Sequence, residues 1–375
     1  MALAWRHIVG HRLTGRASGM RVLAVNAGSS SLKLTVLDAN DRVTDSTAVD
    51  GDADRAGALR TFIEKVGEVD AVAHRIVHGG PHVRRPVLLD DEVRRYLDTA
   101  AAIAPLHVPA ALALVDAARE MRRCPQVVCV DTAFHADLPA AAATYAVPVE
   151  WRELGVQRYG FHGLSYAWAS RRSSELLNRP PAELQLVMAH LGSGVSVCAT
   201  RGGRSVDTSM GFTPLEGAVM ATRSGSVDPG ALLWLQQCHG VAPAEMSVLL
   251  ENHSGLQGLC GRPDMRDVER GASLGDAACL AALDVYVHVL CRTVGAIAAS
   301  LDRIDALVFT GGVGEHSALV RSRVCARLKL LGIPQATAAC AGDAVVATSA
   351  TGTAVVVISA REDAEMAREA RRLLV

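Results

Sequence analysis

Two arginines lie in settings that suggest the binding of anions. Arg75 interrupts the apolar run Val72–Val77, and Arg223 is flanked by small residues in Ala221–Gly225. Because an unpaired charge in an apolar strand is unfavourable, Arg75 requires an anionic partner. That partner is either a carboxylate of the protein, in a structural salt bridge, or a bound substrate. If both guanidinium groups converge, they can hold a carboxylate and a transferring phosphoryl group through paired hydrogen bonds.

Three turns of small residues could bind phosphate. They are Asn26–Ser31, Gly192–Gly194 and Gly311–Gly314, and each follows an apolar run. Missing side chains allow backbone N–H groups to approach phosphate oxygens closely. None of the three is a P-loop, because no Gly-Lys-Ser/Thr follows at the required spacing. A single glycine-rich turn is weak evidence for phosphate binding, because most such turns only reverse the chain. Three of them, each after a predicted strand, predict a nucleotide site.

An acidic residue and a histidine could complete such a site. Asp131 directly follows Val127–Val130, where a carboxylate can hold Mg²⁺ or its waters, or equally cap a helix. His162 lies between two glycines, so we expect a tight loop that is exposed or lines a cleft. Its imidazole could donate to developing negative charge or serve as an acid. Glu362, near the start of the last predicted helix, is a weaker candidate, since acidic residues favour first turns.

The elements that would position these residues alternate between strand and helix. Apolar residues on both sides of Asn26–Ser31 predict a hairpin, and those around Gly192–Gly194 predict a second one. Two such hairpins suggest an internal duplication, with a chance likeness between hairpins as the alternative. Further strands are predicted at Val72–Val77, Val127–Val130, Ala306–Thr310 and Val355–Ile358, and helices at Asp90–Ile103, Pro109–Glu120, 317–331 and Arg361–Leu374. The pattern predicts an α/β fold with mixed sheets.

Composition narrows the class of protein. The 375 residues suffice for two domains, and a formal net charge of -1 argues against nucleic-acid binding. The nine cysteines form no CxxC pair, which favours reduced thiols in a cytosolic protein over a zinc site or a disulfide framework. The apolar stretch Asp276–Ser300 contains charged residues and predicts a buried helix instead of a membrane span. Residues 1–19 lack the apolar core of a secretory signal, and we favour an upstream start codon ahead of Met20 over a presequence.

In combination, these segments closely resemble the acetate kinase family, within the superfamily of actin, sugar kinases and Hsp70. The resemblance covers the chain from Met20 onward. Asn26–Lys33 resembles the first family signature, and Ser209–Gly217 with Thr222–Gly225 resembles the second. The other segments that are similar to family blocks are His74–Gly80, Asp131–His135, Tyr159–Gly163 and Thr310–Glu315.

The resemblance implies a fold and an activity. The expected fold is two duplicated ribonuclease H-like domains of the actin and Hsp70 type, with mixed sheets and an active cleft between them. The expected domains are 20–136 with 365–375, and 137–364 for nucleotide binding and dimerisation, preceded by a disordered extension 1–19. A homodimer would bind ATP and Mg²⁺, or Mn²⁺ in its place, and pass the γ-phosphoryl group directly to acetate.

The resemblance also implies roles for individual residues. Those expected to act in catalysis are Arg75, Asp131, His162 and Arg223. Those expected to hold the metal are Asn26, Asp131 and Glu362. Those expected to contact the substrate are Arg75, Val77, Leu106, Phe161 and Pro214. Those expected to surround the nucleotide are Lys33, His190, Gly192, Ser193, Gly194, Asp264, Arg266, Gly311, Gly312, Gly314 and Glu315.

Three positions depart from the family pattern, each with another residue where Asn is customary. Ser193 would shorten the contact to the nucleotide phosphates or route it through water. Val108 could loosen the loop near the acyl pocket. Arg361 places a bulky cation next to Glu362.

Three alternatives remain open at this point. Propionate kinase differs from acetate kinase only in pocket volume, and one methylene in an apolar pocket is worth about 1–3 kcal/mol. A non-catalytic ATP-binding switch of the actin or Hsp70 kind would have no use for Arg75, Arg223 and His162 as a set. An exopolyphosphatase-type hydrolase would want a carboxylate base to activate water.

Overall fold

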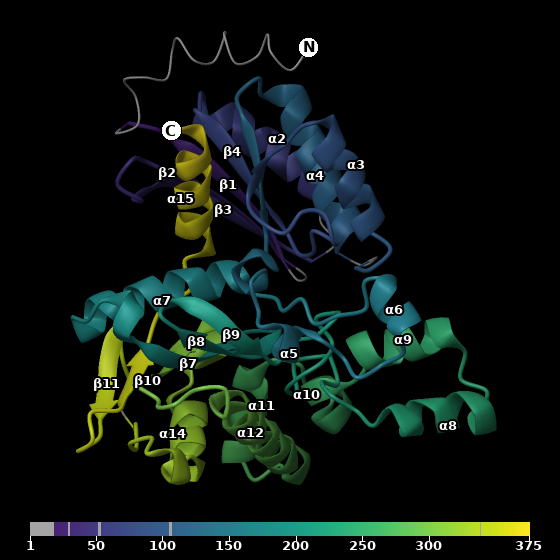
Figure 1. The fold of residues 1–375 in the computed structure, drawn as a ribbon, viewed down its shortest axis with the longest axis vertical. Helices are drawn as coiled ribbons and strands as arrows, with labels where there is room; N and C mark the ends of the chain where they lie inside the picture. Colours follow the sequence, from purple (N-terminus) through teal and green to yellow (C-terminus); the bar gives the residue numbers. More distant parts are fainter. Residues whose placement is uncertain (1–18, 29–30, 52–53, 105–106, 338) are drawn as a thin grey trace. The chain divides into compact units, whose positions relative to one another are not determined.

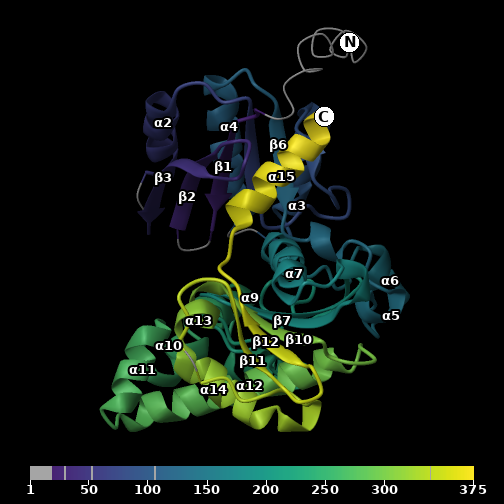
Figure 2. The same cartoon turned by 90° about the vertical axis from the view of Figure 1, so that its left-hand side faces the viewer.

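The computed structural model describes residues 19–28, 31–51, 54–104, 107–337 and 339–375. They form two compact units, which are considered separately (Figures 1 and 2). The first unit runs to Ala136 and takes in Arg361–Val375, and the second is Asp137–Ala360. The chain thus returns to the first unit near the predicted boundary at 365. The predicted extension 1–19 lies, apart from its last residue, outside the described residues.

The first unit is built on a six-stranded mixed sheet. Its strand order is β3 (Val43–Asp50), β2 (Ser31–Leu37), β1 (Val22–Ala27), β4 (Ala71–Ile76), β6 (Gln126–Val130) and β5 (Val87–Leu88). Strands β1 to β3 form an antiparallel meander, β4 and β6 run parallel to β1, and β5 is antiparallel at the edge. The predicted hairpin and the two predicted strands of this half are therefore confirmed.

Helices cover both faces of this sheet. The helices α2 (Arg55–Val66) and α4 (Val108–Met121) bury apolar residues against one face, and α3 (Asp91–Ala100) packs on α4. The other face is covered by α15 (Glu362–Leu374), the yellow helix at the end of the chain (Figure 2). Pro109 lies in the first turn of α4, as predicted. Backbone N–H groups in a first turn have no acceptor within the helix, so the missing N–H of proline costs no hydrogen bond there.

The second unit repeats this plan. Its sheet has the order β9 (Arg204–Thr208), β8 (Val195–Arg201), β7 (Gln185–Leu191), β10 (Ala306–Thr310), β12 (Ala354–Val357) and β11 (Ala344–Thr348). Strands β7 to β9 again form an antiparallel meander, β10 and β12 run parallel to β7, and β11 is antiparallel at the edge. Order and direction match the first sheet strand by strand. The predicted duplication is confirmed.

Helices also enclose the second sheet. The helix α7 (Gly163–Leu177) packs on β7 and β10, and α12 (Ala277–Ala298) packs on β7, β8, α11 (Met265–Ser273) and α14 (Ala318–Arg327). Within the described part of the chain, α12 is the one helix long and apolar enough to cross a membrane. Its inner face, including Leu283, Val287 and Leu290, is buried in the core of the unit, in line with the prediction. The nine cysteines are free thiols, also as predicted.

Two local predictions require correction. The predicted turn Gly311–Gly314 is instead helical, because α13 (Gly311–His316) begins directly after β10. The predicted helix 317–331 ends at Arg327, and Lys329–Leu331 form a separate 3₁₀ turn. In the first case Gly311 absorbs the change of direction, with φ of +76°. Glycine patterns do not distinguish a loop from a strand-to-helix junction.

A buried histidine predicts how the stability of the first unit depends on pH. His74 on β4 is 1% exposed and lies 2.6 Å from Gln126 Oε1 through Nε2. Burial lowers the pKa of His74 from 6.5 to about 4, against the opposing hydrogen bond to Gln126. The unfolded chain therefore binds more protons between these values. We expect the contribution of His74 to the free energy of unfolding to be fully retained above pH 6.5 and to fall toward pH 4, by on the order of 3 kcal/mol.

Urea unfolding at several pH values between about 4.5 and 7 measures this dependence. The control is His74→Gln, which keeps a donor for Gln126 and does not titrate. This variant should show a shallower fall in stability toward low pH than the parent. Equal slopes in the two proteins would contradict the assignment.

Candidate active site

Arg75 is the centre of a polar cluster in the first unit. Its Nε donates to Asp131 Oδ1 at 2.9 Å, and its Nη2 donates to Asp131 Oδ2 at 2.6 Å. Its Nη1 donates to Glu362 Oε2 and to Asn26 Oδ1, both at 3.0 Å. The Asn26 amide also donates to Glu362 Oε2 at 2.7 Å. The predicted anionic partner of Arg75 is confirmed, and it consists of carboxylates of the protein itself.

Four separate elements bring this cluster together. Asn26 lies on β1, Arg75 on the neighbouring strand β4, and Asp131 just beyond β6. Glu362 comes from the first turn of α15, which packs across β1 and β4. Asp131 does not cap the following 3₁₀ turn, whose N-cap residue is Thr132. Its carboxylate bonds Arg75 instead.

The cluster is buried and carries a net negative charge. Asp131 is 1% exposed, and burial raises the pKa of its carboxyl group to about 6 against the opposing charge of Arg75. Burial also opposes the charge of Arg75, but Asp131 and Glu362 outweigh it and raise the pKa of the guanidinium. With both carboxylates ionised, one guanidinium leaves a formal charge of about −1, which favours a further cation.

The residues predicted to hold a metal fit Mg²⁺ by their chemistry. Asn26, Asp131 and Glu362 offer hard oxygen donors, and all of them contact the same guanidinium. Mg²⁺ usually takes one or two carboxylates and completes its shell with water and substrate phosphate. Among the described residues there is no group of three or more His, Cys, Asp and Glu that could hold a metal. A metal at this cluster would therefore depend on the amide of Asn26 and on oxygens from outside the protein.

A second cluster lies in the second unit, around the turn Gly192–Gly194 between β7 and β8. A Cβ atom placed on Gly194 would lie 2.9 Å from Arg223 Nη2 and 3.2 Å from His162 Nε2. One placed on Gly192 would lie 3.3 Å from His190 Nε2. The His162 and His190 rings stack with centroids 4.2 Å apart. Three predicted side chains, those of Arg223, His162 and His190, thus meet at this glycine turn.

Arg223 differs from Arg75, because none of the described residues gives it a carboxylate partner. Its Nη1 donates to the Pro214 carbonyl at 2.7 Å. Within the described ranges it forms no ion pair, and burial lowers the pKa of its guanidinium while the charge of Glu251 partly opposes this. A largely buried guanidinium without a counter-ion is unfavourable in the absence of a ligand. An anionic ligand bound to this guanidinium would offset that cost.

His162 is buried, so the first of its two expected positions, exposed or lining a cleft, is wrong. It is 9% exposed and has φ of 58°, in the left-handed region, at the residue before α7. Its Nδ1 lies 2.9 Å from the buried hydroxyl of Ser196 on β8. The flanking glycines do permit the sharp turn, but the turn folds the imidazole into the unit. Ser196 was not predicted, and the only signal for it is a serine within an otherwise apolar strand.

A further network that was not predicted holds the segment Ser209–Gly217. Arg158 Nη2 donates to Glu216 Oε1 at 2.8 Å, Tyr145 donates to Glu216 Oε2, and the backbone N–H of Phe212 donates to Tyr145 at 3.0 Å. Because Arg223 bonds Pro214 in this same segment, the network supports the position of its guanidinium.

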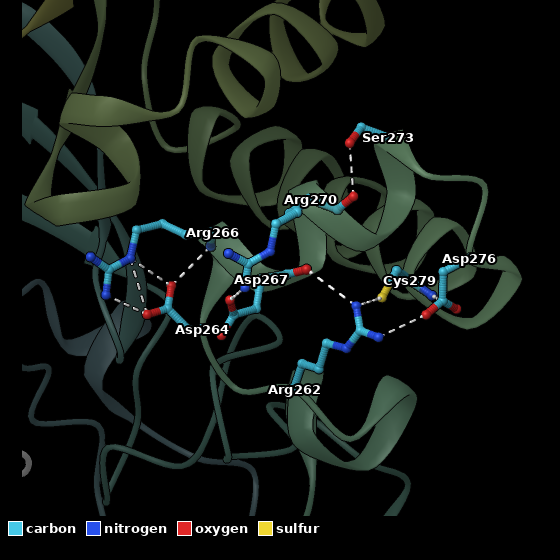
Figure 3. Close-up of polar contacts among 8 residues, drawn as sticks. All are labelled: Arg262, Asp264, Arg266, Asp267, Arg270, Ser273, Asp276 and Cys279. Atoms are coloured by element: carbon cyan, nitrogen blue, oxygen red, sulfur yellow. Dashed lines mark hydrogen bonds and ion pairs between the residues drawn. The ribbon is translucent and has the colours of Figure 1, made fainter.

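The remaining nucleotide candidates lie on two other elements. Gly311 begins α13, and a Cβ there would come within 2.9 Å of the Leu191 backbone, so the close approach of β10 to β7 requires glycine. Glu315 accepts the backbone N–H of Ala360 at 3.0 Å. Asp264 caps α11 and pairs with the exposed Arg266, through Nε at 3.0 Å (Figure 3). Gly312 is exposed and Gly314 is buried.

The candidates for the acyl pocket are less closely connected. Phe161 is buried and Pro214 half-buried, both in the second unit, whereas the half-buried Val77 lies in the first. Leu106 lies outside the described residues. Lys33 is exposed on β2, directly opposite Asn26 on β1.

The three departures from the family pattern have distinct environments. Val108 is fully buried at the start of α4, so it contributes to the core. The Arg361 guanidinium bonds Asp363 at 2.9 Å, so the cation next to Glu362 has its own counter-ion. Ser193 is exposed at the tip of the β7–β8 turn.

The position of Ser193 gives a testable prediction. Ser193→Asn should lower KM for ATP by about 2- to 10-fold at unchanged kcat, because the longer amide can add one net hydrogen bond. Ser193→Ala is the matched control and should change KM little. If all three proteins share one KM, Ser193 has no part in nucleotide binding.

The duplicated pair of mixed six-stranded sheets defines an α/β protein built of two like units. The profile of the Acetokinase family matches residues 54–368. The acetate kinase of Synechococcus sp. (strain JA-2-3B'a(2-13)) is 41% identical over 401 aligned positions, covering 95% of this chain and 99% of that protein. The acetate kinase of Streptomyces avermitilis is 42% identical over 352 positions, covering 84% and 87%. The chain belongs to the acetate kinase family, as its motifs predicted.

Solved structures agree with this assignment. The crystal structure of Porphyromonas gingivalis acetate kinase matches with a TM-score of 0.86 at 31% identity, covering 95% of this chain and 100% of that one. A propionate kinase from Francisella tularensis matches with a TM-score of 0.83 at 29% identity, covering 93% and 98%. The predicted fold class is confirmed.

Proposed function

We propose that the protein is an acetate kinase that transfers the γ-phosphoryl group of ATP to acetate by direct in-line displacement. An acetate oxygen forms a bond to the γ-phosphorus, the bond from that phosphorus to the β–γ bridging oxygen breaks, and ADP leaves with acetyl phosphate as the product. The same steps in reverse form ATP. We further propose that the second unit carries the nucleotide site and that the protein is cytoplasmic, in keeping with its free thiols.

The observation that carries this proposal is the environment of Arg223. The Arg223 guanidinium, which forms no ion pair among the described residues, lies beside an imidazole and the glycine turn Gly192–Gly194. Phosphoryl transfer needs positive charge around the equatorial oxygens and in-line positioning more than it needs a nucleophilic side chain. Arg223 and His162 supply that charge and a donor. Gly192, Ser193 and Gly194 supply backbone groups for phosphate.

In this proposal the Arg75 cluster serves the same reaction. Asn26, Asp131 and Glu362 would hold Mg²⁺, for which Mn²⁺ can substitute, and the metal supplies charge that neutralises the phosphate oxygens. When Asp131 and Glu362 hold the metal, Arg75 would lose part of its pairing with them and would bind the acetate carboxylate. The cleft between the two halves that the resemblance implies stays a prediction.

Acetate can accept the phosphoryl group without the help of a general base. Acetate is already ionised at neutral pH, so no group has to remove a proton from it. A hydrolase would require a residue that activates water, and a non-catalytic switch would have no use for an unpaired Arg223. Both alternatives are therefore less consistent with the second cluster.

The decisive test is formation of acyl phosphate, trapped as the hydroxamate, from ATP, Mg²⁺ and acetate. We expect hydroxamate only when all three are present, with ADP formed in equal amount. ADP and inorganic phosphate without hydroxamate would identify a hydrolase. Nucleotide binding without turnover would identify a switch.

Propionate kinase activity is the second candidate, favoured by the similarity to the Francisella propionate kinase. Comparison of kcat/KM for acetate, propionate and butyrate decides between them. One methylene changes binding in an apolar pocket by about 1–3 kcal/mol, so we expect a preference of about 10- to 200-fold and overlap between substrates.

We also propose that the protein is a homodimer that uses the exposed apolar residues of α8 (Pro229–His239) and α9 (Pro243–Asn252). No residue of α8 is buried in the chain, and Leu233 and Trp234 are each 54% exposed. Val248 and Leu249 on α9 are 48% and 40% exposed. Exposed clusters of large apolar side chains mark association surfaces. A second copy of the chain would bury them.

Charged substitution at this surface is expected to give a monomer. Leu233→Glu with Trp234→Glu places two carboxylates where the partner would bury apolar side chains, a change that disfavours association strongly. Sedimentation equilibrium measures the mass. Leu330→Glu is the matched control, because Leu330 is exposed alone in a 3₁₀ turn. A parent protein that is already monomeric, or a double variant that stays dimeric, would contradict the proposal.

A further inference from the structure

The two stacked imidazoles of the second unit are each held by a buried serine. His162 Nδ1 lies 2.9 Å from Ser196 Oγ, and His190 Nδ1 lies 2.8 Å from Ser165 Oγ. Both serines are fully buried. With Nδ1 occupied in this way, each ring turns its Nε2 toward the Gly192–Gly194 turn. The serines therefore decide which ring nitrogen faces the proposed phosphate site.

Ser196 is itself bonded by Tyr166, a fully buried residue on α7. The Tyr166 hydroxyl lies 2.5 Å from Ser196 Oγ. Burial raises the pKa of Tyr166 well above its ordinary value, and the hydrogen bond between Tyr166 and Ser196 only partly offsets this. Tyr166 is therefore a phenol with one proton to donate throughout the working range of pH.

The direction of the hydrogen bonds sets the tautomer of His162. The Tyr166 hydroxyl and Ser196 Oγ lie 2.5 Å apart, at a distance where either oxygen can donate. When the Tyr166 proton is directed to Ser196 Oγ, the single Ser196 proton is left for His162 Nδ1. A neutral imidazole that accepts at Nδ1 carries its proton at Nε2.

We propose that Tyr166 and Ser196 are positioning residues that hold His162 in the tautomer protonated at Nε2, so that this N–H points at the phosphoryl site beside Gly194. The inference rests on the proposed function, in which His162 stabilises the transferring phosphoryl group. A donor is useful there only if its proton is on the nitrogen that faces the site. The opposite tautomer would present a lone pair to the phosphate oxygens.

The first test is kinetic. Ser196→Ala removes the group that fixes Nδ1, and we expect kcat to fall by about 10- to 100-fold, as for other residues that orient a functional imidazole. KM for acetate and for ATP should change far less than kcat, because the substrates do not touch Ser196. Tyr166→Phe should lower kcat in the same direction by a smaller factor. Ser173→Ala is the matched control, a buried serine of α7 whose hydroxyl has no hydrogen-bond partner among the described residues, and it should leave kcat unchanged.

The second test observes the tautomer directly. In protein labelled with ¹⁵N in the histidine rings, at about pH 8, two-bond correlations distinguish a ring protonated at Nε2 from one protonated at Nδ1. The His162 signal is assigned by its loss in His162→Asn. We expect the Nε2–H pattern in the parent and in Ser173→Ala, and a mixture of both tautomers in Ser196→Ala and Tyr166→Phe.

The outcomes separate the inference from the function on which it rests. An Nδ1–H pattern in the parent overturns the inference without any variant. Folded Ser196→Ala and Tyr166→Phe proteins with the parent pattern and the parent kcat also overturn it, and Tyr166→Phe serves alone if Ser196→Ala does not fold. A His162→Asn variant with the parent kcat would instead refute the proposed role of His162. In that case the tautomer measurement still decides whether Tyr166 and Ser196 set the ring.

Discussion

Replacing Arg223 by alanine is expected to lower kcat for acetyl phosphate formation by about 10³-fold or more, the range found for arginines that stabilise transferring phosphoryl groups. Stability should not fall with it. Within the part of the chain that the structure describes, Arg223 has no carboxylate partner to leave behind, and its removal orphans one bond to the Pro214 carbonyl. Burial lowers the pKa of its guanidinium, so holding that charge is unfavourable in the absence of ligand. An activity loss at equal or raised stability is the signature of a residue kept for binding.

The hydroxamate assay and thermal unfolding together measure this result. Arg223→Lys is the matched control, because it keeps the charge and loses the planar pair of donors. Its kcat should lie between those of the parent and Arg223→Ala. Full activity in Arg223→Ala would show that the second cluster is not the site of transfer.

Replacing Arg75 by alanine is expected to damage activity and stability together. Asp131 and Glu362 would then be left close together and largely buried without a counter-ion. Breaking a buried ion pair on one side typically costs about 3–5 kcal/mol. We expect the free energy of unfolding to fall by about that amount and acetyl phosphate formation to fall by at least about 10²-fold. Because burial already raises the pKa of Asp131, the stability loss should shrink as the pH is lowered toward 5, where this carboxyl group takes up a proton.

A double variant separates the two roles of Arg75. Adding Asp131→Asn to Arg75→Ala removes one of the orphaned charges and should restore part of the stability, while activity stays low. Urea unfolding at about pH 7.5 and pH 5 gives the stabilities, and the hydroxamate assay gives kcat. If the double variant regained activity, Arg75 would be a structural ion-pair partner only, which was the alternative open from the sequence.

Comparison of these two variants tests the proposed division of labour. Arg75 is fully paired within the protein, and Arg223 is not. The sequence presented the two arginines as equivalent candidates. Only their partners distinguish them, and the carboxylates that pair with Arg75 come from distant parts of the chain.

The sequence alone indicated the main strands and the family. The alternation of apolar residues in β2 and β8 and the apolar runs of β4, β6 and β10 are local patterns, because side chains on a strand repeat every two residues. The family motifs are likewise contiguous segments. The need of Arg75 for an anion also followed from its local setting, since a charge in an apolar strand is unfavourable wherever the strand lies.

The tertiary structure decided which groups meet. Arg75 finds Asp131 and Glu362, which are 56 and 287 positions away in the chain, because the order of the sheet and the return of α15 bring them together. The burial of His162, its link to Ser196 and Tyr166, and the lack of a carboxylate at Arg223 depend in the same way on packing between elements. A periodic pattern specifies the face on which a side chain lies, but not the neighbour that the fold places there.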